Sequence, residues 1–153
     1  MEDKVMSTTT TTPLPTITFA AQPTPAAGES SSASPLSGTC HCGRVSITVP
    51  SPPQRMNECQ CSICYRYGAL WAYYARGAVS ITGETQPYAR ADAHGKGDLA
   101  FHRCAHCGSV THWAGVRDTP TRRRVGPEAK MGINCRMLPE EVIRGAERIV
   151  TSV

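Results

Sequence analysis

The sequence predicts a mainly β domain of small antiparallel sheets, with one short helix near its C-terminus. Short segments alternate apolar and polar residues with a period of two, as in "RVSITV" at 44–49. Turn signals separate these segments: "TGE" at 82–84, "HGKGD" at 94–98 and "CGS" at 107–109. Only one segment has a helical pattern. Small sheets give a modest core for the chain length, so we expect an additional staple.

The first 37 residues differ in composition from the rest of the 153-residue chain. They are rich in Thr, Ser, Pro and Ala, and they offer little apolar surface to offset the entropy of ordering. We therefore predict a disordered tail over 1–37 and one folded domain over 38–153.

Seven segments of the folded part are predicted to be β-strands, because they are rich in apolar residues and are bounded by turn signals. They cover 44–49, 69–75, 78–82, 87–91, 99–104, 109–115 and 130–137. The segment 114–130 has no periodicity, which predicts a long loop. Long loops in compact domains are often functional.

The predicted helix covers 138–147, "LPEEVIRGAE". Pro139 suits a first helical position, and Glu140 and Glu141 lie near the positive end of the helix dipole. Gly145 indicates an early end to the helix.

The charge of the folded part favours a small anionic partner. The tail holds one basic and three acidic residues, so residues 38–153 carry 15 Lys and Arg against 9 Asp and Glu. Apart from Arg122, Arg123 and Arg124 the basic residues are scattered, which argues against nucleic-acid binding. The sequence has neither an apolar run of membrane-spanning length nor a secretory signal, and we expect a cytoplasmic location.

All eight cysteines lie between positions 40 and 135. In a chain without a secretory signal, C-x-C and C-x-x-C pairs favour metal binding over disulfides. Cys40 and Cys42 form one close pair, and Cys104 and Cys107 form another; a glycine and a predicted strand follow each. Four thiolates at about 2.3 Å from Zn²⁺ make a closed, structural site. The spacing therefore predicts a zinc ion that joins the start of the domain to its middle.

A second cysteine group is "CQCSIC", with Cys59, Cys61 and Cys64. Zinc takes four ligands, so three thiolates leave one position that is either open, as in a catalytic site, or filled from elsewhere. The side chains that could fill it are Cys135, His102 and His112. The spacing leaves both readings open. If the position is open, Zn²⁺ with three thiolates is better suited to hold a soft substrate thiol than to activate water.

An aromatic run follows the second group and coincides with the predicted strand 69–75. With a period of two, Leu70, Ala72 and Tyr74 share one face, and Trp71 and Tyr73 share the other. We expect one face to be core. Since Tyr and Trp carry polar groups, the other face is a candidate pocket wall.

Four separated motifs resemble the glutathione-dependent formaldehyde-activating enzyme family, also called the GFA or centromere protein V family. They are "GTCHCG" (38–43), "CQCSICYRYGALWAYY" (59–74), "FHRCAHCGSVTHW" (101–113) and "KMGINCRML" (130–138). The resemblance implies a zinc-stapled β-tent fold of two to three small sheets. It implies glutathione or a glutathione adduct as substrate, and a reaction that makes or breaks a carbon–sulfur bond, as in forming S-(hydroxymethyl)glutathione.

The resemblance also assigns the metal ligands. The structural zinc takes Cys40, Cys42, Cys104 and Cys107; the catalytic zinc takes Cys59, Cys61 and Cys64. Four positions depart from the usual family pattern: Gln60, Tyr65, Ser109 and Cys135. Gln60 and Tyr65 flank the predicted catalytic loop, so these departures bear on the formaldehyde substrate more than on the zinc. A larger electrophile or a thioether is consistent with them.

Two functional hypotheses follow. The first is a zinc-dependent carbon–sulfur lyase or thiol-adduct synthase. Its candidate proton-transfer residues are Tyr73, Tyr74 and His112. Its candidate partners for the glutathione carboxylates are Arg66, Arg136 and the run Arg122, Arg123 and Arg124. The second hypothesis is a non-enzymatic zinc module that binds a macromolecule. It is weaker for nucleic acid because the tail is not basic.

Overall fold

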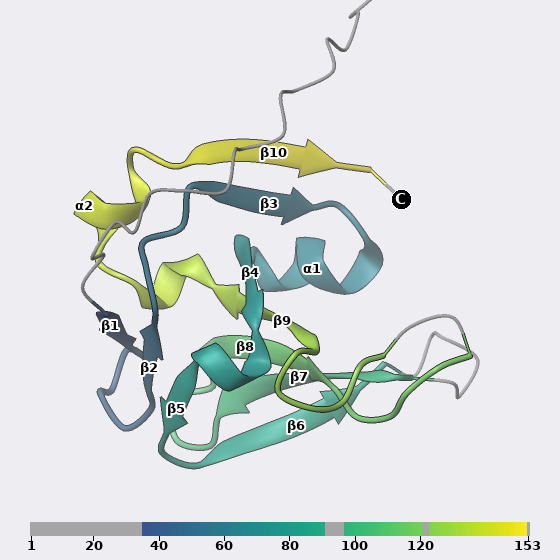
Figure 1. Ribbon diagram of the computed structural model, residues 1–153. Coiled ribbons are helices and arrows are strands. Elements are labelled where there is room, and N and C mark those ends of the chain that lie inside the picture. Colours follow the sequence, from purple (N-terminus) through teal and green to yellow (C-terminus); the bar gives the residue numbers. More distant parts are fainter. Residues whose placement is uncertain (1–34, 91–96, 121–122, 153) are drawn as a thin grey trace, which may run out of the picture. The chain divides into compact units, whose positions relative to one another are not determined.

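The computed structural model describes residues 35–90, 97–120 and 123–152. These residues belong to the second of two units into which the chain divides, 32–153. They form two β-sheets, two short α-helices and two 3₁₀ turns, which confirms the predicted mainly β class (Figure 1). The predicted tail lies outside the described residues except for its last three. In the part of the chain that is described, no helix is long and apolar enough to span a membrane.

The smaller sheet has three antiparallel strands in the order β1–β2–β5. Their bounds are β1 Leu36–Thr39, β2 Ser46–Val49 and β5 Ser80–Thr82. β1 begins two residues before position 38, the predicted start of the folded domain. Its sequence does not show the strand, because Ser37 and Gly38 supply no apolar alternation. Gly38 is required here, since a Cβ at this position would lie 2.1 Å from the carbonyl oxygen of Met137.

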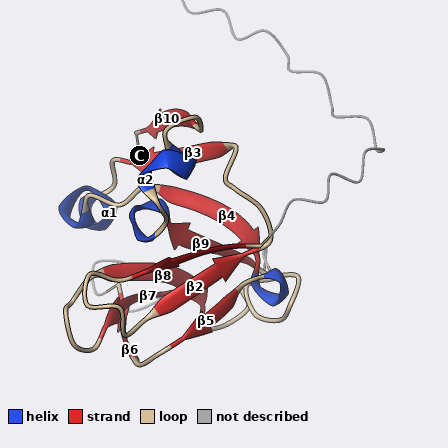
Figure 2. Ribbon diagram, turned by 90° about the vertical axis from the view of Figure 1, so that its left-hand side faces the viewer, coloured by secondary structure: helices blue, strands red, loops and turns tan. Residues whose placement is uncertain are grey.

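The larger sheet has seven strands in the order β10–β3–β4–β9–β8–β7–β6. Their bounds are β3 Arg55–Cys59, β4 Trp71–Ala75, β6 Thr85–Ala89, β7 Leu99–Cys104, β8 Val110–Gly115, β9 Lys130–Asn134 and β10 Glu147–Thr151. β10 pairs in parallel with β3, so the prediction of purely antiparallel sheets is wrong for this pair. Figure 2 shows β3 and β10 side by side at one end of the sheet.

One row of residues crosses the larger sheet in register from β6 to β4. Its members, in order, are Tyr88, Phe101, Trp113, Gly132 and Tyr73. We call the face that carries this row the site face. Gly132 leaves a gap in the row, because a Cβ there would lie 2.1 Å from the indole Nε1 of Trp113. The rings of Trp113 and Tyr73 therefore approach each other across β9, with centroids 6.0 Å apart.

The opposite face of the larger sheet, which we call the core face, holds the main hydrophobic packing. Ala72, Met131 and Ile133 are almost completely buried on it. Met131 and Ile133 pack in the cluster that contains Val45 and Ile47 of the neighbouring small-sheet segment. Burying such aliphatic side chains contributes about 1.5–3 kcal/mol each. This packing joins the two sheets and leaves the site face for other elements.

Two short α-helices flank the larger sheet, α1 Ser62–Tyr67 and α2 Glu140–Ile143. The helix predicted over 138–147 is present as α2 but is shorter than predicted, and α1 is a second helix. α2 ends after one turn, and from Glu147 the chain pairs with β3 instead. α1 was not predicted because six residues are too few to show helical periodicity. It ends at Gly68, whose φ of 58° lets its N–H reach back to the carbonyls of Cys64 and Tyr65.

Each of the seven predicted strands overlaps an observed strand, and 99–104 coincides with β7. The predicted strand 130–137 is too long, because the side chain of Asn134 accepts the N–H of Arg136 and starts a 3₁₀ turn, Cys135–Met137. Strands β1, β3 and β10 were not predicted. The other 3₁₀ turn, Arg76–Ala78, delays the start of β5. The predicted turn at 94–98 falls mostly on residues that the structure does not describe.

Candidate metal centres

The first cysteine group is built from two matched turns, one between β1 and β2 and one between β7 and β8. Its members are Cys40, Cys42, Cys104 and Cys107. In each turn the first cysteine donates its N–H to a carbonyl five residues ahead, Cys40 to Val45 and Cys104 to Ser109, both at 2.9 Å. The glycine after each pair, Gly43 or Gly108, has a φ of 74°. Glycine adopts this conformation without the steric cost of a side chain, so both turns fold back alike.

The four sulfur atoms of this group lie within 4.8 Å of one another. The Sγ of Cys42 is 3.5 Å from that of Cys40 and 3.7 Å from that of Cys104. Tetrahedral zinc with bonds of about 2.3 Å places its sulfur ligands about 3.8 Å apart. All eight cysteines of the chain are free thiols. The arrangement fits a closed four-thiolate zinc site.

The electrostatics of the first group also fit a cation. The hydroxyl and N–H of Ser109 stabilise the Cys107 thiolate and lower its pKa to about 5. The amide of Arg44 favours the thiolate of Cys42, but burial and the neighbouring sulfurs outweigh it and raise the pKa of Cys42 to about 11. Four thiolates so close together therefore need a positive ion between them.

The second cysteine group lies on the site face, where β3 leads into α1. Cys59 ends β3, Cys61 is the N-cap residue of α1, and Cys64 lies within the helix. Their sulfurs lie within 4.8 Å of one another. The C-terminal strand braces this loop, because the N–H of Gln60 donates to the carbonyl of Thr151 at 2.8 Å. Three separate elements therefore fix the three thiols.

The environment of this group favours thiolates unequally. Burial opposes ionisation of Cys61, but the N–H of Cys64 at the start of α1 and the neighbouring thiols favour its thiolate, so the pKa of Cys61 is lowered. Burial raises the pKa of Cys64 to about 12. The indole Nε1–H of Trp71 donates to the Sγ of Cys64 at 3.2 Å, which favours its ionised form. A cation between the thiols would ionise all three.

None of the three side chains that could close this group lies beside it. Cys135 is buried on the core face with Leu70 and Ala72, whereas Cys64 packs with Trp71 on the site face. His102 and His112 oppose each other on β7 and β8, next in sequence to site-face residues and therefore pointing to the other face. Within residues 35–90, 97–120 and 123–152, the group has only its three thiols as His, Cys, Asp or Glu ligands.

The three candidate proton-transfer residues are separated by the sheet. Tyr73 lies on the site face, where the charges of all three thiols act on it, and its hydroxyl accepts the Nδ2–H of Asn57 at 2.6 Å. Tyr74 packs on the core face and donates its hydroxyl to the carbonyl of Ser51 at 3.0 Å. His112 is buried on that face too, and burial lowers its pKa to about 3. The structure brings only Tyr73 to the second cysteine group.

The candidate arginines that the structure describes lie around α1 and in the loop before β9. Arg66 donates from Nη1 to the carbonyl of Ser62 in its own helix, at 2.6 Å. Arg136 donates from Nε to the carbonyl of Gly68 at the end of the helix, at 2.7 Å. Arg123 and Arg124 precede β9, and Arg122 lies outside the described residues. Arg66 and Arg136 therefore brace α1.

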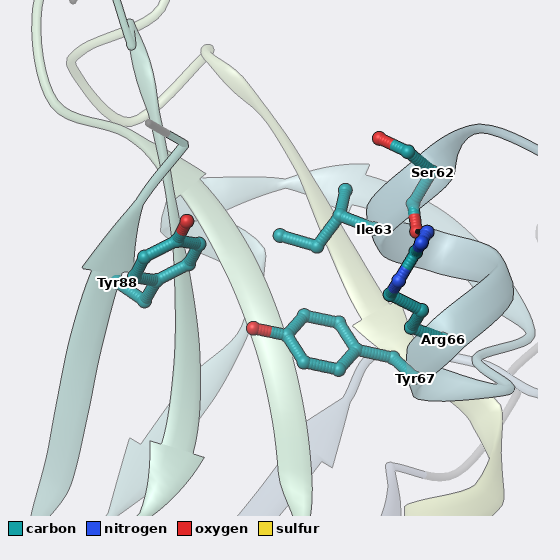
Figure 3. Close-up of a pocket in the computed structure, with 5 residues that line it drawn as sticks. All are labelled: Ser62, Ile63, Arg66, Tyr67 and Tyr88. Carbon is teal, nitrogen blue, oxygen red and sulfur yellow. Dashed lines mark hydrogen bonds between the residues drawn. The ribbon is translucent and has the colours of Figure 1, made fainter. Parts of the chain in front are cut away.

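Two hollows open on the site face. One, which we call the helix hollow, has a volume of about 420 Å³ and is lined by Ser62, Ile63, Arg66, Tyr67 and Tyr88. Figure 3 shows Tyr88 of β6 on one side of it and Tyr67 and Ile63 of α1 on the other. The other, which we call the cationic hollow, has a volume of about 430 Å³ and is lined by Tyr73, Leu99, Trp113, Arg123, Arg124 and Lys130. Both volumes fall in the range of small-ligand sites.

These features define a β domain with one closed thiol centre and one open thiol centre beside two ligand-sized hollows. A family model described as "Glutathione-dependent formaldehyde-activating enzyme" matches residues 35–127. The chain belongs to this family.

One similar crystal structure is of a Rhodobacter sphaeroides protein, a structural-genomics target whose title gives no function. It is 28% identical, with a TM-score of 0.56, and the match covers 76% of this chain and 100% of that one. A search of curated proteins found no significant match.

Several residues of the site were not singled out from the sequence. Asn57 and Lys130 reach the ring of Tyr73 from neighbouring strands. Trp113 and Tyr88 join the site face only through strand register. A weak signal for Asn57 was its position two residues before Cys59, on the same face of a strand. Nothing in the spacing of the others places them near the thiols.

Proposed function

We propose that this chain is a carbon–sulfur lyase or thiol-adduct synthase that acts on glutathione or a glutathione conjugate. The observation that carries the proposal is the second cysteine group, which offers three thiols and no fourth ligand in the described part of the chain. A site of this kind accepts the sulfur of a small thiol or thioether as its fourth ligand. We place zinc at both groups, and we expect the protein to act in the cytoplasm, where thiols stay reduced.

Cys59, Cys61 and Cys64 would hold the catalytic zinc. When bound, zinc would supply a Lewis acid that favours the ionised form of a substrate sulfur. The chain fixes the three ligands through the amides at the start of α1 and the indole of Trp71. Such outer contacts orient ligands and tune a metal site. The helix hollow begins at Ser62 and Ile63, between two of the ligands, and can receive the group attached to sulfur.

Tyr73 is our proposed acid. Burial raises its pKa, so its hydroxyl is protonated at neutral pH. Its oxygen accepts from Asn57, which leaves its own O–H to point to a substrate. When glutathione sulfur adds to a carbonyl carbon, the C–S bond forms, the C=O π bond breaks, and the oxygen takes the proton of Tyr73. Solvent then returns a proton to Tyr73. The thiol proton has gone to solvent, so the step balances, and the reverse breaks the adduct.

The competing function is a non-enzymatic zinc module. It predicts a closed second metal site and no adduct chemistry. The open fourth ligand position of the second cysteine group and the two hollows beside it favour the enzyme.

Exchange NMR with a series of glutathione adducts tests the proposal. The wild-type protein should accelerate exchange between glutathione and at least one adduct, the hydroxymethyl adduct being the first to try. Cys61→Ala should abolish this acceleration and keep the fold, because the first cysteine group still staples the domain. Cys40→Ser is the matched control and should unfold the protein. Equal loss of stability in both variants, with no exchange in the wild type, would support the module instead.

A further inference from the structure

We propose that the cationic hollow binds the carboxylates of the substrate, and that Lys130 and Arg123 are its specificity-determining residues. This inference rests on the proposed function and adds where the peptide part of glutathione lies. The sequence offered Arg66, Arg136 and the run Arg122–Arg124 as carboxylate partners. Of these, the proposal keeps Arg123 and sets Arg66 and Arg136 aside.

The cationic hollow and the second cysteine group share one hydrophobic cluster. Trp113 packs against the cluster that contains Cys64 and Trp71 and is flanked by Cys59. Tyr73 meets Trp113 across Gly132, so the two rings form one wall of the hollow, and the charges of all three thiols act on Tyr73. A ligand whose sulfur lies at the thiols can therefore extend over these rings.

Two arginines of the cationic hollow, Arg123 and Arg124, belong to the loop before β9, and two aspartates hold this loop in place. Arg124 forms an ion pair with Asp98 at 2.5 Å. The carboxylate of Asp118 accepts the N–H groups of Arg124 and Val125, at 2.7 and 3.0 Å. These contacts fix the loop and neutralise one of its arginines.

Lys130 and Arg123 supply the remaining positive charge of the hollow's lining. The Nζ of Lys130 lies 4.0 Å above the ring of Tyr73, a cation–π contact that holds it at the hollow. Lys130 lies two residues before Gly132 on β9 and therefore on the same face of the sheet.

Electrostatics require such a cationic region. Three thiolates with one Zn²⁺ carry a net charge of −1, and glutathione brings two carboxylates toward them. Like charges that approach in a partly buried site repel strongly, so a cationic region beside the thiols is needed to offset the repulsion. Arg66 and Arg136 are less suited, because each already donates to a carbonyl of α1.

The test measures binding of glutathione and of its diethyl ester, which has no free carboxylate, to cobalt-substituted protein by the change in cobalt–thiolate absorption. Lys130→Met, which keeps the stem over Tyr73, and Arg123→Gln should each raise the Kd for glutathione by about tenfold. Both should leave the Kd for the diester within about twofold of wild type, since the lost contact is to a carboxylate.

The control variants Arg66→Gln and Arg136→Gln remove one positive charge at α1 instead of at the cationic hollow. They should leave the preference for glutathione over the diester unchanged. The proposal is overturned if Lys130→Met and Arg123→Gln bind glutathione as wild type does, if they weaken both ligands equally, or if Arg66→Gln gives the selective loss. A wild-type spectrum that responds to neither ligand would instead contradict the proposed function. Circular dichroism of each variant checks that it is folded.

Discussion

Cys64 is the buried thiol of the second cysteine group, and Trp71 is its hydrogen-bond donor. The indole ring packs against Phe101, with ring centroids 5.9 Å apart, and the Phe101 ring packs against Tyr67, with centroids 5.8 Å apart. This chain of rings ties the position of one sulfur to the packing of α1 on the sheet. A metal at the group would depend on that packing for the orientation of its ligand.

Trp71→Phe should keep the packing and remove the hydrogen bond to Cys64. We expect the second site to lose about 10- to 100-fold in zinc affinity, as for other outer contacts of metal ligands. Zinc release to a colorimetric chelator should have a fast phase from the second site and a slow phase from the first. Trp71→Phe should accelerate only the fast phase. Trp113→Phe is the control, because its indole lies over Gly132. Equal release rates for Trp71→Phe and wild type would mean that this hydrogen bond does not support the metal.

Strands β7 and β8 carry a stacked histidine pair on the core face, of which His112 is buried and His102 half-buried. The rings of His102 and His112 stack with centroids 4.2 Å apart. His112 shares a ring nitrogen contact of 2.9 Å with the hydroxyl of Thr111, and His102 one of 3.1 Å with that of Thr85. Burial, then His102, then Arg76 lower the pKa of His112 to about 3. The stacked rings pack β7 against β8 on the face opposite the second cysteine group.

The stability of the domain should therefore fall in mild acid. Between its folded pKa of about 3 and its ordinary value of 6.5, His112 takes up a proton only in the unfolded chain. The contribution is fully present above pH 6.5 and is lost as the pH falls toward about 3. His112→Asn should flatten the pH dependence of the unfolding free energy between about pH 7 and about pH 5, measured by urea titration. Parallel curves for variant and wild type would show that His112 does not govern it.

Local pattern predicted the central strands well, because β4, β7, β8 and β9 carry dense apolar residues. It missed β3 and β10 because they pair with each other from far apart in the chain, Glu147 lying opposite Arg55. It missed β1 because Ser37 and Gly38 supply no apolar alternation. The same distinction holds for the site. The cysteine groups were visible as short spacings, whereas Lys130 and Trp113 reach the site through register across several strands.

At the scale of the whole described chain, both ends of the domain support a cysteine group. β1 leads into the turn with Cys40, and β10 braces the loop after Cys59 through Thr151. Thr151 also donates its hydroxyl to the side chain of Asn57 at 2.8 Å. Segments far apart in sequence thus fix the thiols of both groups.

Truncation should therefore depend sharply on where it ends. Removing 1–34 should leave the melting temperature unchanged, because that composition offers little to pack. Removing 1–37 also deletes Leu36, which packs on the core, and Ser37, whose hydroxyl bonds that of Thr48 at 2.8 Å. We expect the second truncation to lower the melting temperature by about 4–8 °C, the effect of roughly 1 kcal/mol in a domain of this size. Equal melting temperatures would mean that β1 contributes little.

The central claim is that the first cysteine group is closed and the second is open to a substrate sulfur. Cadmium-113 NMR of the cadmium-substituted protein tests it most directly, because the shift reports the number of sulfur ligands at each site. We expect two resonances, one at the four-sulfur position and one at lower frequency. Glutathione should move only the second toward the four-sulfur position, and S-methylglutathione should move it less. Two resonances already at the four-sulfur position, with neither moved by glutathione, would contradict the account.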